Sequence, residues 1–146
     1  MDMAATARTS GLLRKHDLRV TKGRTDILGI FLRQGIALSE RELEDLLGDS
    51  CDRVTIYRTL TTFLEHGLLH RVPDDAGAAK YALCAGCAHQ VHRHDHIHFK
   101  CTRCGQTTCV EEVRIPTPAL PPGFILTEVS MLMQGICPAC SGLAAR

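Results

Sequence analysis

The sequence predicts an α+β protein with two parts of different character, residues 1–83 and 84–146. The first part places apolar residues at helical spacing and contains a single cysteine, Cys51. Seven of the eight cysteines and five of the eight histidines follow residue 83, in a stretch with strand-like alternation and several prolines. The turn-forming run PDDAGAA at 73–79 precedes this division. We therefore expect a helical domain followed by a small α/β domain.

The first helices are marked by their ends. Thr21 is a helix-capping residue, and the helix that follows it, near 22–34, ends before a glycine. Ser39 and Glu42 have the spacing of a capping box, which predicts a second, short helix. The side chains that this helix should bury are Leu43, Leu46 and Leu47.

A third helix is expected to begin near Ser50 or Cys51 and to end before Gly67. Its apolar residues have the spacing of a buried stripe: Ile56, Leu60, Phe63 and Leu64. The run 68–83 then reads as two strands around a turn. Helix, helix, helix and hairpin is the order of a winged helix-turn-helix.

The third helix also has a polar face, which Thr55, Arg58, Thr59 and Thr62 should share. A recognition helix docks one face on its own domain and offers polar, arginine and aromatic side chains to DNA. Arg58 could contact a phosphate or a guanine edge, and Tyr57 could lie against a thymine methyl group. An ordinary amphipathic surface helix has the same periodicity, so that alternative stays open. The net charge of +1 does not decide between them.

Two C-x-x-C pairs are the strongest chemical signal in the chain: Cys101 with Cys104, and Cys137 with Cys140. Zinc prefers four soft ligands in a tetrahedron, and each pair places two thiolates on one turn. Because four thiolates leave no open position, the pairs predict a structural zinc site that ties the end of the chain to an earlier strand. Two unrelated reduced pairs, or a redox switch, are the alternatives.

A row of histidines alternates with other residues just before the first pair: His92, His94, His96 and His98. In a strand, a period of two places all four imidazoles on one face. This spacing predicts metal binding by at least two of them. His89 and His92 could instead lie on a loop.

The composition argues against several other classes of protein. No apolar run reaches the length of a membrane span, and the first residues lack the hydrophobic region of a signal peptide. A cytoplasmic location is therefore expected, where thiols stay reduced and bind metal more often than they form disulfides. The zinc-hydrolase motif H-E-x-x-H and the deaminase motif H-x-E with P-C-x-x-C are both absent. We therefore expect no enzyme activity.

Two motifs resemble those of the Fur (ferric uptake regulator) family. Its members carry a T-x-x-R-x-x-I-L pattern on an early helix and a T-V-Y-R-x-L pattern on the recognition helix. This chain has TKGRTDIL at 21–28 and TIYRTL at 55–60. The spacing between them, the following G-L-L and the later cysteine pairs also match. The likeness covers roughly residues 10–142.

The resemblance implies a metal-dependent repressor that binds AT-rich palindromic double-stranded DNA as a homodimer. The second domain would then serve dimerisation and metal sensing, with one structural Zn²⁺ and one regulatory divalent ion. The resemblance also implies these DNA-contacting residues: Arg24, Thr55, Tyr57 and Arg58.

The same resemblance implies the regulatory ligands, which are His70, Cys84, His96 and His98. His96 and His98 precede Cys101, the first cysteine of the C-x-x-C pairs, by five and three residues. The other two residues match ligands of zinc-sensing members. Many relatives carry an acidic ligand five residues after Cys104. Here that position is Cys109, and Glu111 lies close enough to substitute for the acid.

Three departures from the family pattern bear on the sensed metal. Ala37 stands where iron-sensing relatives carry a histidine, their wing glutamate is missing around Ala82, and a further site has no match near Val129 or Ser130. The proline-rich run at 115–123 also opposes a helix that relatives carry there. Fewer oxygen ligands and more thiolates favour zinc, so the zinc-sensing (Zur-like) branch is predicted. The alternatives are an iron- or peroxide-sensing member using Fe²⁺ or Mn²⁺, and a zinc-holding interaction module without a DNA role.

Overall fold

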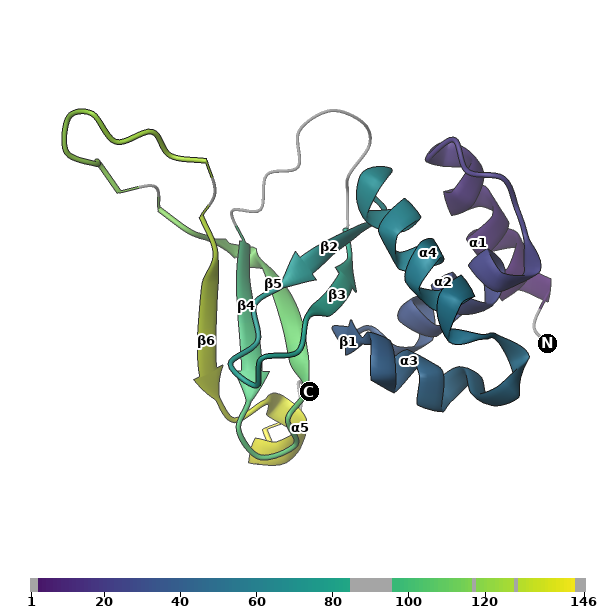
Figure 1. Cartoon of the computed structure of the whole chain (residues 1–146). Helices are drawn as coiled ribbons and strands as arrows, with labels where there is room; N and C mark the ends of the chain where they lie inside the picture. The colour runs from purple at the N-terminus through teal and green to yellow at the C-terminus, as the bar shows by residue number, and fades with distance from the viewer. Residues whose placement is uncertain (1–2, 85–95, 117, 128, 144–146) are drawn as a thin grey trace. The chain divides into compact units, whose positions relative to one another are not determined.

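The computed structural model describes residues 3–84, 96–116, 118–127 and 129–143 (Figure 1). The chain divides into two compact units, residues 1–92 and 93–146, which we call unit 1 and unit 2. The predicted division after residue 83 stays a prediction. Along the described ranges, no helix combines the length and the apolar character needed to cross a bilayer.

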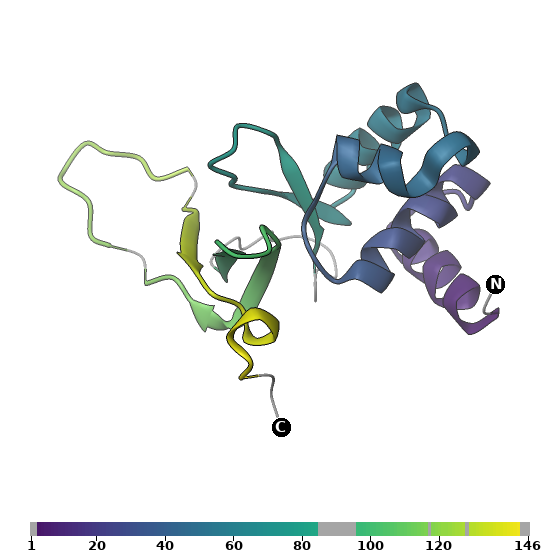
Figure 2. The ribbon, with the colours of Figure 1, turned by 90° about the horizontal axis from the view of Figure 1, so that it is seen from below.

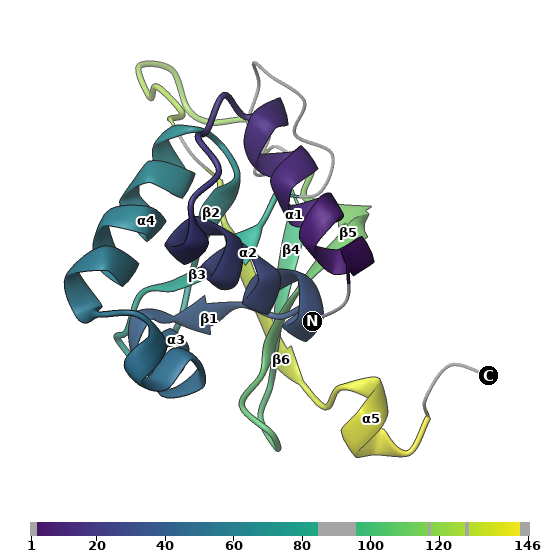
Figure 3. The same ribbon diagram turned by 90° about the vertical axis from the view of Figure 1, so that its right-hand side faces the viewer.

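Unit 1 contains the helices and a small sheet. The helices are α1 (Met3–Lys15), α2 (Lys22–Gln34), α3 (Glu40–Leu47) and α4 (Arg53–Glu65), with a 3₁₀ turn at Gly48–Ser50. The strands are β1 (Leu38–Ser39), β2 (Leu69–Val72) and β3 (Lys80–Leu83). They form an antiparallel sheet in the order β1-β3-β2, and α2 lies between α1 and α4 (Figure 3). The β2–β3 hairpin is the wing that the sequence predicts.

The first two predicted helix ends are confirmed. The Thr21 side chain accepts a hydrogen bond from the Arg24 N–H, and α2 ends at Gly35, whose φ of 63° suits glycine. At α3, Ser39 accepts from the Glu42 N–H at 3.2 Å and donates its own N–H to the Glu42 carboxylate at 2.7 Å. This reciprocal pair is the predicted capping box.

Three details of the sequence prediction are wrong. Helix α4 begins at Arg53 rather than near Ser50, because the Asp52 carboxylate caps it by accepting the Thr55 N–H at 2.9 Å. Leu46 is 50% exposed, since an eight-residue helix has room for one buried stripe and Leu43 occupies it. Thr59 is 6% exposed and belongs to the buried face of α4, not to the polar one.

The core of unit 1 joins the helices to the wing. Its fully buried members come from all four helices and from β2. They include Leu13, Ile27, Leu28, Phe31, Leu43, Ile56, Leu60, Phe63 and Leu69. The position of α4 is therefore set by close packing against the rest of the unit.

Unit 2 is built on a second three-stranded sheet. Its elements are β4 (His96–Cys101), β5 (Thr107–Arg114), β6 (Met131–Gly135) and the short helix α5 (Pro138–Ser141). The strand order is β5-β4-β6, with β4 antiparallel to β5 and parallel to β6 (Figure 1). Gly135 lies against the Phe99 ring so closely that a Cβ there would meet the ring at 2.9 Å. The close approach brings the end of the chain onto β4.

The connection between β5 and β6 has no helix in its described residues, as its prolines predict. It turns at Pro121–Phe124, where the Phe124 N–H donates to the Pro121 carbonyl at 3.3 Å and Gly123 has a φ of 91°. Within unit 2 this connection extends away from the sheet (Figures 1 and 2).

Candidate metal centres and nucleic-acid interface

The four cysteines of the two C-x-x-C pairs converge in unit 2. The Sγ atoms of Cys101, Cys104, Cys137 and Cys140 all lie within 4.8 Å of one another, and all four thiols are free. The register of the parallel β4–β6 pair explains the convergence, because it places Cys101 opposite Gly135, two residues before the second pair. The predicted tie between the chain end and an earlier strand is thus present.

The spacing of the sulfurs suits zinc. A tetrahedral site with Zn–S bonds of about 2.3 Å has sulfur–sulfur edges of about 3.8 Å. The Sγ atoms of Cys104 and Cys137 are 3.9 Å apart. Four thiolates complete the coordination shell, so an ion held there has no position for substrate. The quartet fits a structural metal and no catalytic one.

Backbone N–H groups prepare one thiol of this quartet for metal binding. The N–H groups of Cys104 and Cys137 point at the Cys101 Sγ, at 3.5 and 3.4 Å. These hydrogen bonds lower the pKa of Cys101 to about 6. The Arg103 guanidinium also donates to the Cys140 carbonyl at 2.6 Å, which joins the first pair to the second. Cys101 is therefore the thiol of the quartet most ready to act as a thiolate.

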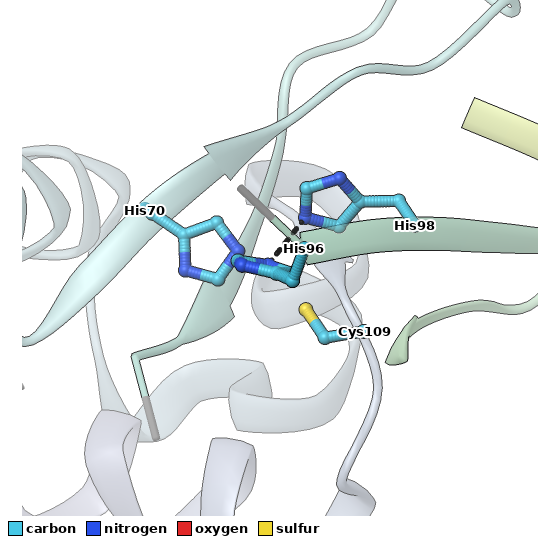
Figure 4. A group of neighbouring side chains, drawn as sticks. All are labelled: His70, His96, His98 and Cys109. Atoms are coloured by element: carbon cyan, nitrogen blue, oxygen red, sulfur yellow. Dashed lines mark hydrogen bonds between the residues drawn. The ribbon is translucent and has the colours of Figure 1, made fainter. Parts of the chain in front are cut away.

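A second donor group lies on β4 and β5 of unit 2. The Nε2 atoms of His96 and His98 are 3.1 Å apart, and the ligand atoms of both lie within 4.8 Å of the Cys109 Sγ (Figure 4). The two histidines share a face because they are two residues apart in a strand. Cys109 joins them because the β4–β5 register pairs it with His98. An edge of about 3.3 Å is expected between two imidazole nitrogens on one tetrahedral zinc ion.

Cys109 is held as a neutral thiol. Burial raises its pKa to about 12, and the nearby Glu111 carboxylate adds to the effect. Glu111 is exposed and does not belong to the donor group of the described residues. A cation placed among the three donors would favour the thiolate form of Cys109 and displace its proton.

Unit 1 carries a further pair of possible metal ligands, one on β2 and one just after β3. The His70 Nδ1 lies 3.3 Å from the Cys84 Sγ, because β2 and β3 are neighbouring strands of the wing. His70 is buried and Cys84 is half-buried. Two of the four predicted regulatory ligands are therefore close together in unit 1, and the other two in unit 2. Cys87, His89, His92 and His94 lie outside the described residues.

The DNA contacts implied by the resemblance lie on α2 and α4. On α4, Tyr57 is 59% exposed and Arg58 is exposed, whereas Thr55 is half-buried and donates its hydroxyl to the Asp52 carboxylate at 2.7 Å. On α2, the guanidinium of Arg24 donates to the Arg19 carbonyl at 2.9 Å. Exposed aromatic and cationic side chains on one helix are suited to contact the bases and phosphates of DNA.

Arg53, the first residue of α4, is not among the DNA contacts that the resemblance implies. Its Nε lies 3.1 Å from a Glu44 carboxylate oxygen and 3.5 Å from one of Glu40, so two acids of α3 orient it. Val54, beside it, is an exposed apolar residue on the same helix. The capping position of Asp52 was the signal that could have placed both residues at the start of the helix.

Comparison with known proteins agrees with these features. Residues 15–119 match the ferric uptake regulator family. The chain is 30% identical over 141 residues to the zinc uptake regulation protein of Escherichia coli (strain K12), covering 92% of this chain and 80% of the relative. It is 33% identical over 138 residues to the ferric uptake regulation protein of Bordetella parapertussis, covering 88% and 93%. A solved structure of a zinc uptake regulator complexed with zinc and DNA has a TM-score of 0.67 at 25% identity, covering 98% of this chain and 97% of that chain.

The winged helical unit, the cysteine quartet and these matches define a metal-binding, DNA-binding regulator of transcription. The chain belongs to the ferric uptake regulator family. Regulators of this family are not enzymes, so the prediction of a non-enzymatic protein is confirmed. The α+β fold class is confirmed as well.

Proposed function

We propose that this regulator senses zinc and represses transcription as a DNA-bound homodimer. The observation that carries the proposal is the donor group of His96, His98 and Cys109 on unit 2. Nitrogen and sulfur donors suit Zn²⁺, whereas Fe²⁺ and Mn²⁺ sensors rely more on carboxylate oxygens. The relatives include proteins named for zinc uptake and for iron uptake at about the same identity, so the donor chemistry is the argument for zinc.

The regulatory ion takes ligands from both units. Unit 2 supplies two imidazoles and a thiol, one donor short of a tetrahedron, and His70 of unit 1 supplies the fourth. Cys84 contacts the Nδ1 of His70 and acts either as the thiolate ligand in place of Cys109 or as the group that orients the His70 ring. The ion then joins the units and restricts their motion.

Restricting that motion is what links metal to DNA. A two-fold pair of recognition helices fits two half-sites at one separation, and the ion-bound chain holds that separation. The ion must favour this form by several kcal/mol to change DNA occupancy strongly, roughly 5.5 kcal/mol for a switch from 1% to 99%. Arg24, Thr55, Tyr57 and Arg58 are the proposed DNA contacts.

The experiment is a mobility-shift titration with protein stripped of weakly held metal, an AT-rich palindromic duplex, and added Zn²⁺, Fe²⁺ or Mn²⁺. We expect Zn²⁺ to restore binding of the original chain and of Cys51→Ser, the control thiol outside both donor groups. His96→Ala should stay folded and lose the metal response. A full zinc response in His96→Ala contradicts the proposal, and restoration by Fe²⁺ alone favours the iron-sensing alternative.

The same titration separates the two thiols. Cys84→Ser and Cys109→Ser are matched variants, because each replaces one thiol by a hydroxyl. Removing the thiol that coordinates the ion should weaken the zinc response strongly. Removing a thiol that only contacts the site should weaken it less. If both variants keep the original response, neither thiol is a ligand and the preference for zinc fails.

A further inference from the structure

The exposed face of α4 is less polar than its sequence suggests. Val54, Tyr57 and Arg58 stand at positions i, i+3 and i+4, so they share one face of the helix. Val54 is 58% exposed, Tyr57 is 59% exposed, and Arg58 is exposed as well. On the other side of α4, Ile56 and Leu60 are buried in the core of unit 1. The helix therefore offers an isopropyl group, a phenol ring and one guanidinium group to a partner.

Three threonines of α4 donate their hydroxyl hydrogens within the protein. Thr55 donates to the Asp52 carboxylate at 2.7 Å. Thr61 and Thr62 each donate to the backbone carbonyl four residues earlier, at 3.0 and 2.9 Å. A hydroxyl that donates in this way has no hydrogen left for an acceptor atom on a base. These threonines therefore supply no hydrogen-bond donor to a base edge.

The first turn of α4 also has no cation free of acidic partners. Arg53 is the basic residue of this turn, and its Nε lies 3.1 Å from an oxygen of Glu44 and 3.5 Å from one of Glu40. Asp52 adds a third carboxylate as the cap of the helix. A phosphate would have to compete with carboxylates for this guanidinium, and the acceptor edge of guanine would meet the same competition. An uncharged contact is therefore favoured at this end of α4.

Thymine is the base whose major-groove edge suits such a contact. Its 5-methyl group is the one methyl group that the four bases present in that groove. The N-terminal residues of a recognition helix are the ones that contact base edges, and Val54 is the second residue of α4. Tyr57 lies about 4.5 Å further along the helix axis, compared with about 3.4 Å between successive bases. The two side chains are therefore placed to contact different base pairs.

A protein partner is a poorer occupant of this face. The exposed large apolar side chains of α4 are Val54 and Tyr57. Together they present on the order of 200 Å², taking roughly 200 Å² for a fully exposed large side chain. A standard protein interface buries roughly 800 Å² on each partner. Two side chains on a convex helix match a pair of base edges better than they match a protein surface.

We propose that Val54 is a specificity-determining residue whose isopropyl group contacts the 5-methyl group of one thymine in each half-site. The preference for thymine at that position then comes from a methyl contact and not from a hydrogen bond. The inference rests on the DNA binding proposed above. It adds a residue that precedes the TIYRTL motif at 55–60 and is not part of it.

The test removes the methyl group and leaves the rest of the base in place. Deoxyuridine lacks the 5-methyl group of thymidine and keeps its O4 acceptor. In the AT-rich palindromic duplex, each thymine of one half-site and its symmetry mate are replaced in turn. Affinity of the zinc-loaded full chain is measured at one fixed salt concentration. The variant is Val54→Ala, and the control is Leu46→Ala, because Leu46 is 50% exposed but lies on α3.

We expect one position at which the original chain loses about fourfold in affinity per half-site, and roughly 15-fold for the symmetric pair, which is the effect of one buried methylene-sized group. In Val54→Ala the loss at that position should fall to about twofold or less. All other positions should keep their original effect, because the two changes are coupled only where the side chain meets the methyl group. Leu46→Ala should reproduce the pattern of the original chain.

Two results overturn the inference. One is a Val54→Ala chain that keeps the original sensitivity at every thymine. The other is a Val54→Ala chain that loses affinity for every duplex by the same factor, because the residue would then act through the helix and not through a methyl group. Alanine favours an exposed helix more than valine does, so the variant should fold, and amide protection of α4 checks this.

Failure of the zinc-sensing proposal gives a different pattern. DNA binding would then not respond to Zn²⁺, yet the thymine scan, made in whichever metal state binds, would still identify a position that depends on Val54. Zinc-dependent binding without such a position contradicts only the present inference. A chain that binds no duplex in any metal state contradicts the proposed function and the inference together.

Discussion

His16 and His66, fifty residues apart, each direct a ring Nδ1 at the backbone carbonyl oxygen of the other. The two distances are 2.9 Å from His16 to the His66 oxygen and 3.0 Å in the reverse direction. Because a carbonyl oxygen only accepts, both Nδ1 atoms must carry a hydrogen. One residue follows α1 and the other follows α4, so the pair ties the ends of these helices together.

Replacing either histidine should loosen the end of α4. We expect His16→Ala and His66→Ala each to lower the local unfolding free energy by about 1 kcal/mol, the net value of a buried hydrogen bond. Each variant removes one ring donor and keeps both backbone carbonyls, so each breaks one bond. The double variant should lose less than the sum, because loss of one bond already loosens the contact on which the other depends. Hydrogen exchange of α4 amides in the full chain measures this, with Glu65→Ala as the neighbouring control. Strict additivity would show that the two bonds do not act as a unit.

The start of α4 should depend on pH through Asp52. Hydrogen bonds from the Thr55 hydroxyl and N–H hold the pKa of Asp52 below its ordinary 3.8. A depressed acid pKa means that the stabilisation is present above 3.8 and is lost as the pH falls through the lower folded value. The Thr55 amide resonance, followed by NMR, should therefore titrate below 3.8. Asp52→Asn keeps the acceptor and should remove the titration, and an inflection at or above 3.8 in the original chain would contradict the cap.

Removal of the quartet's ion should unfold unit 2 and leave unit 1 intact. Metal bound to such a site contributes on the order of 10 kcal/mol to folding. A strong chelator, or Cys101→Ser, should abolish amide protection in β4 and β6 while the helices of unit 1 stay protected. Cys51→Ser should behave as the original chain does. Acid should release the ion, because protons compete with it for the thiolates. Full protection of β6 in a chain shown to be free of zinc would refute a structural role.

Glu111→Gln distinguishes the two roles considered for this acid. The carboxylate raises the pKa of Cys109 together with burial, so its removal should lower that pKa and make the thiolate easier to form. If Cys109 is the ligand, the variant should bind zinc at least as tightly as the original chain at neutral pH, with a weaker dependence on pH. Competition against a coloured chelator measures this. A large loss of affinity would instead identify Glu111 as the ligand.

The features that were predictable from sequence in unit 1 are the local ones. The Thr21 cap and the Ser39–Glu42 box each involve residues three positions apart, so each can be recognised as a short sequence motif. The beginning of α4 was missed because Ser50 and Asp52 are both acceptable caps in sequence, and the hydrogen bond from the Thr55 N–H selects Asp52. Thr59 was misplaced because its burial depends on what packs over α4.

In the candidate metal sites, too, the local features were predictable from sequence and the long-range ones were not. The two C-x-x-C pairs and the alternation of His96 with His98 predicted metal binding from spacing alone. Cys109 was at best an alternative, because no local pattern connects it with the histidines. The His70–Cys84 pair followed from the resemblance, and the hairpin pairing of β2 with β3 brings the two side chains together.

By itself the sequence determined which residues can bind metal, where the helices are capped and where proline forbids a helix, since each depends on neighbours a few positions away. The tertiary structure decided which donors meet. Strand register sets Cys109 opposite His98 and Gly135 opposite Cys101. Register is chosen by packing between different strands, and for that reason the local sequence pattern does not specify it.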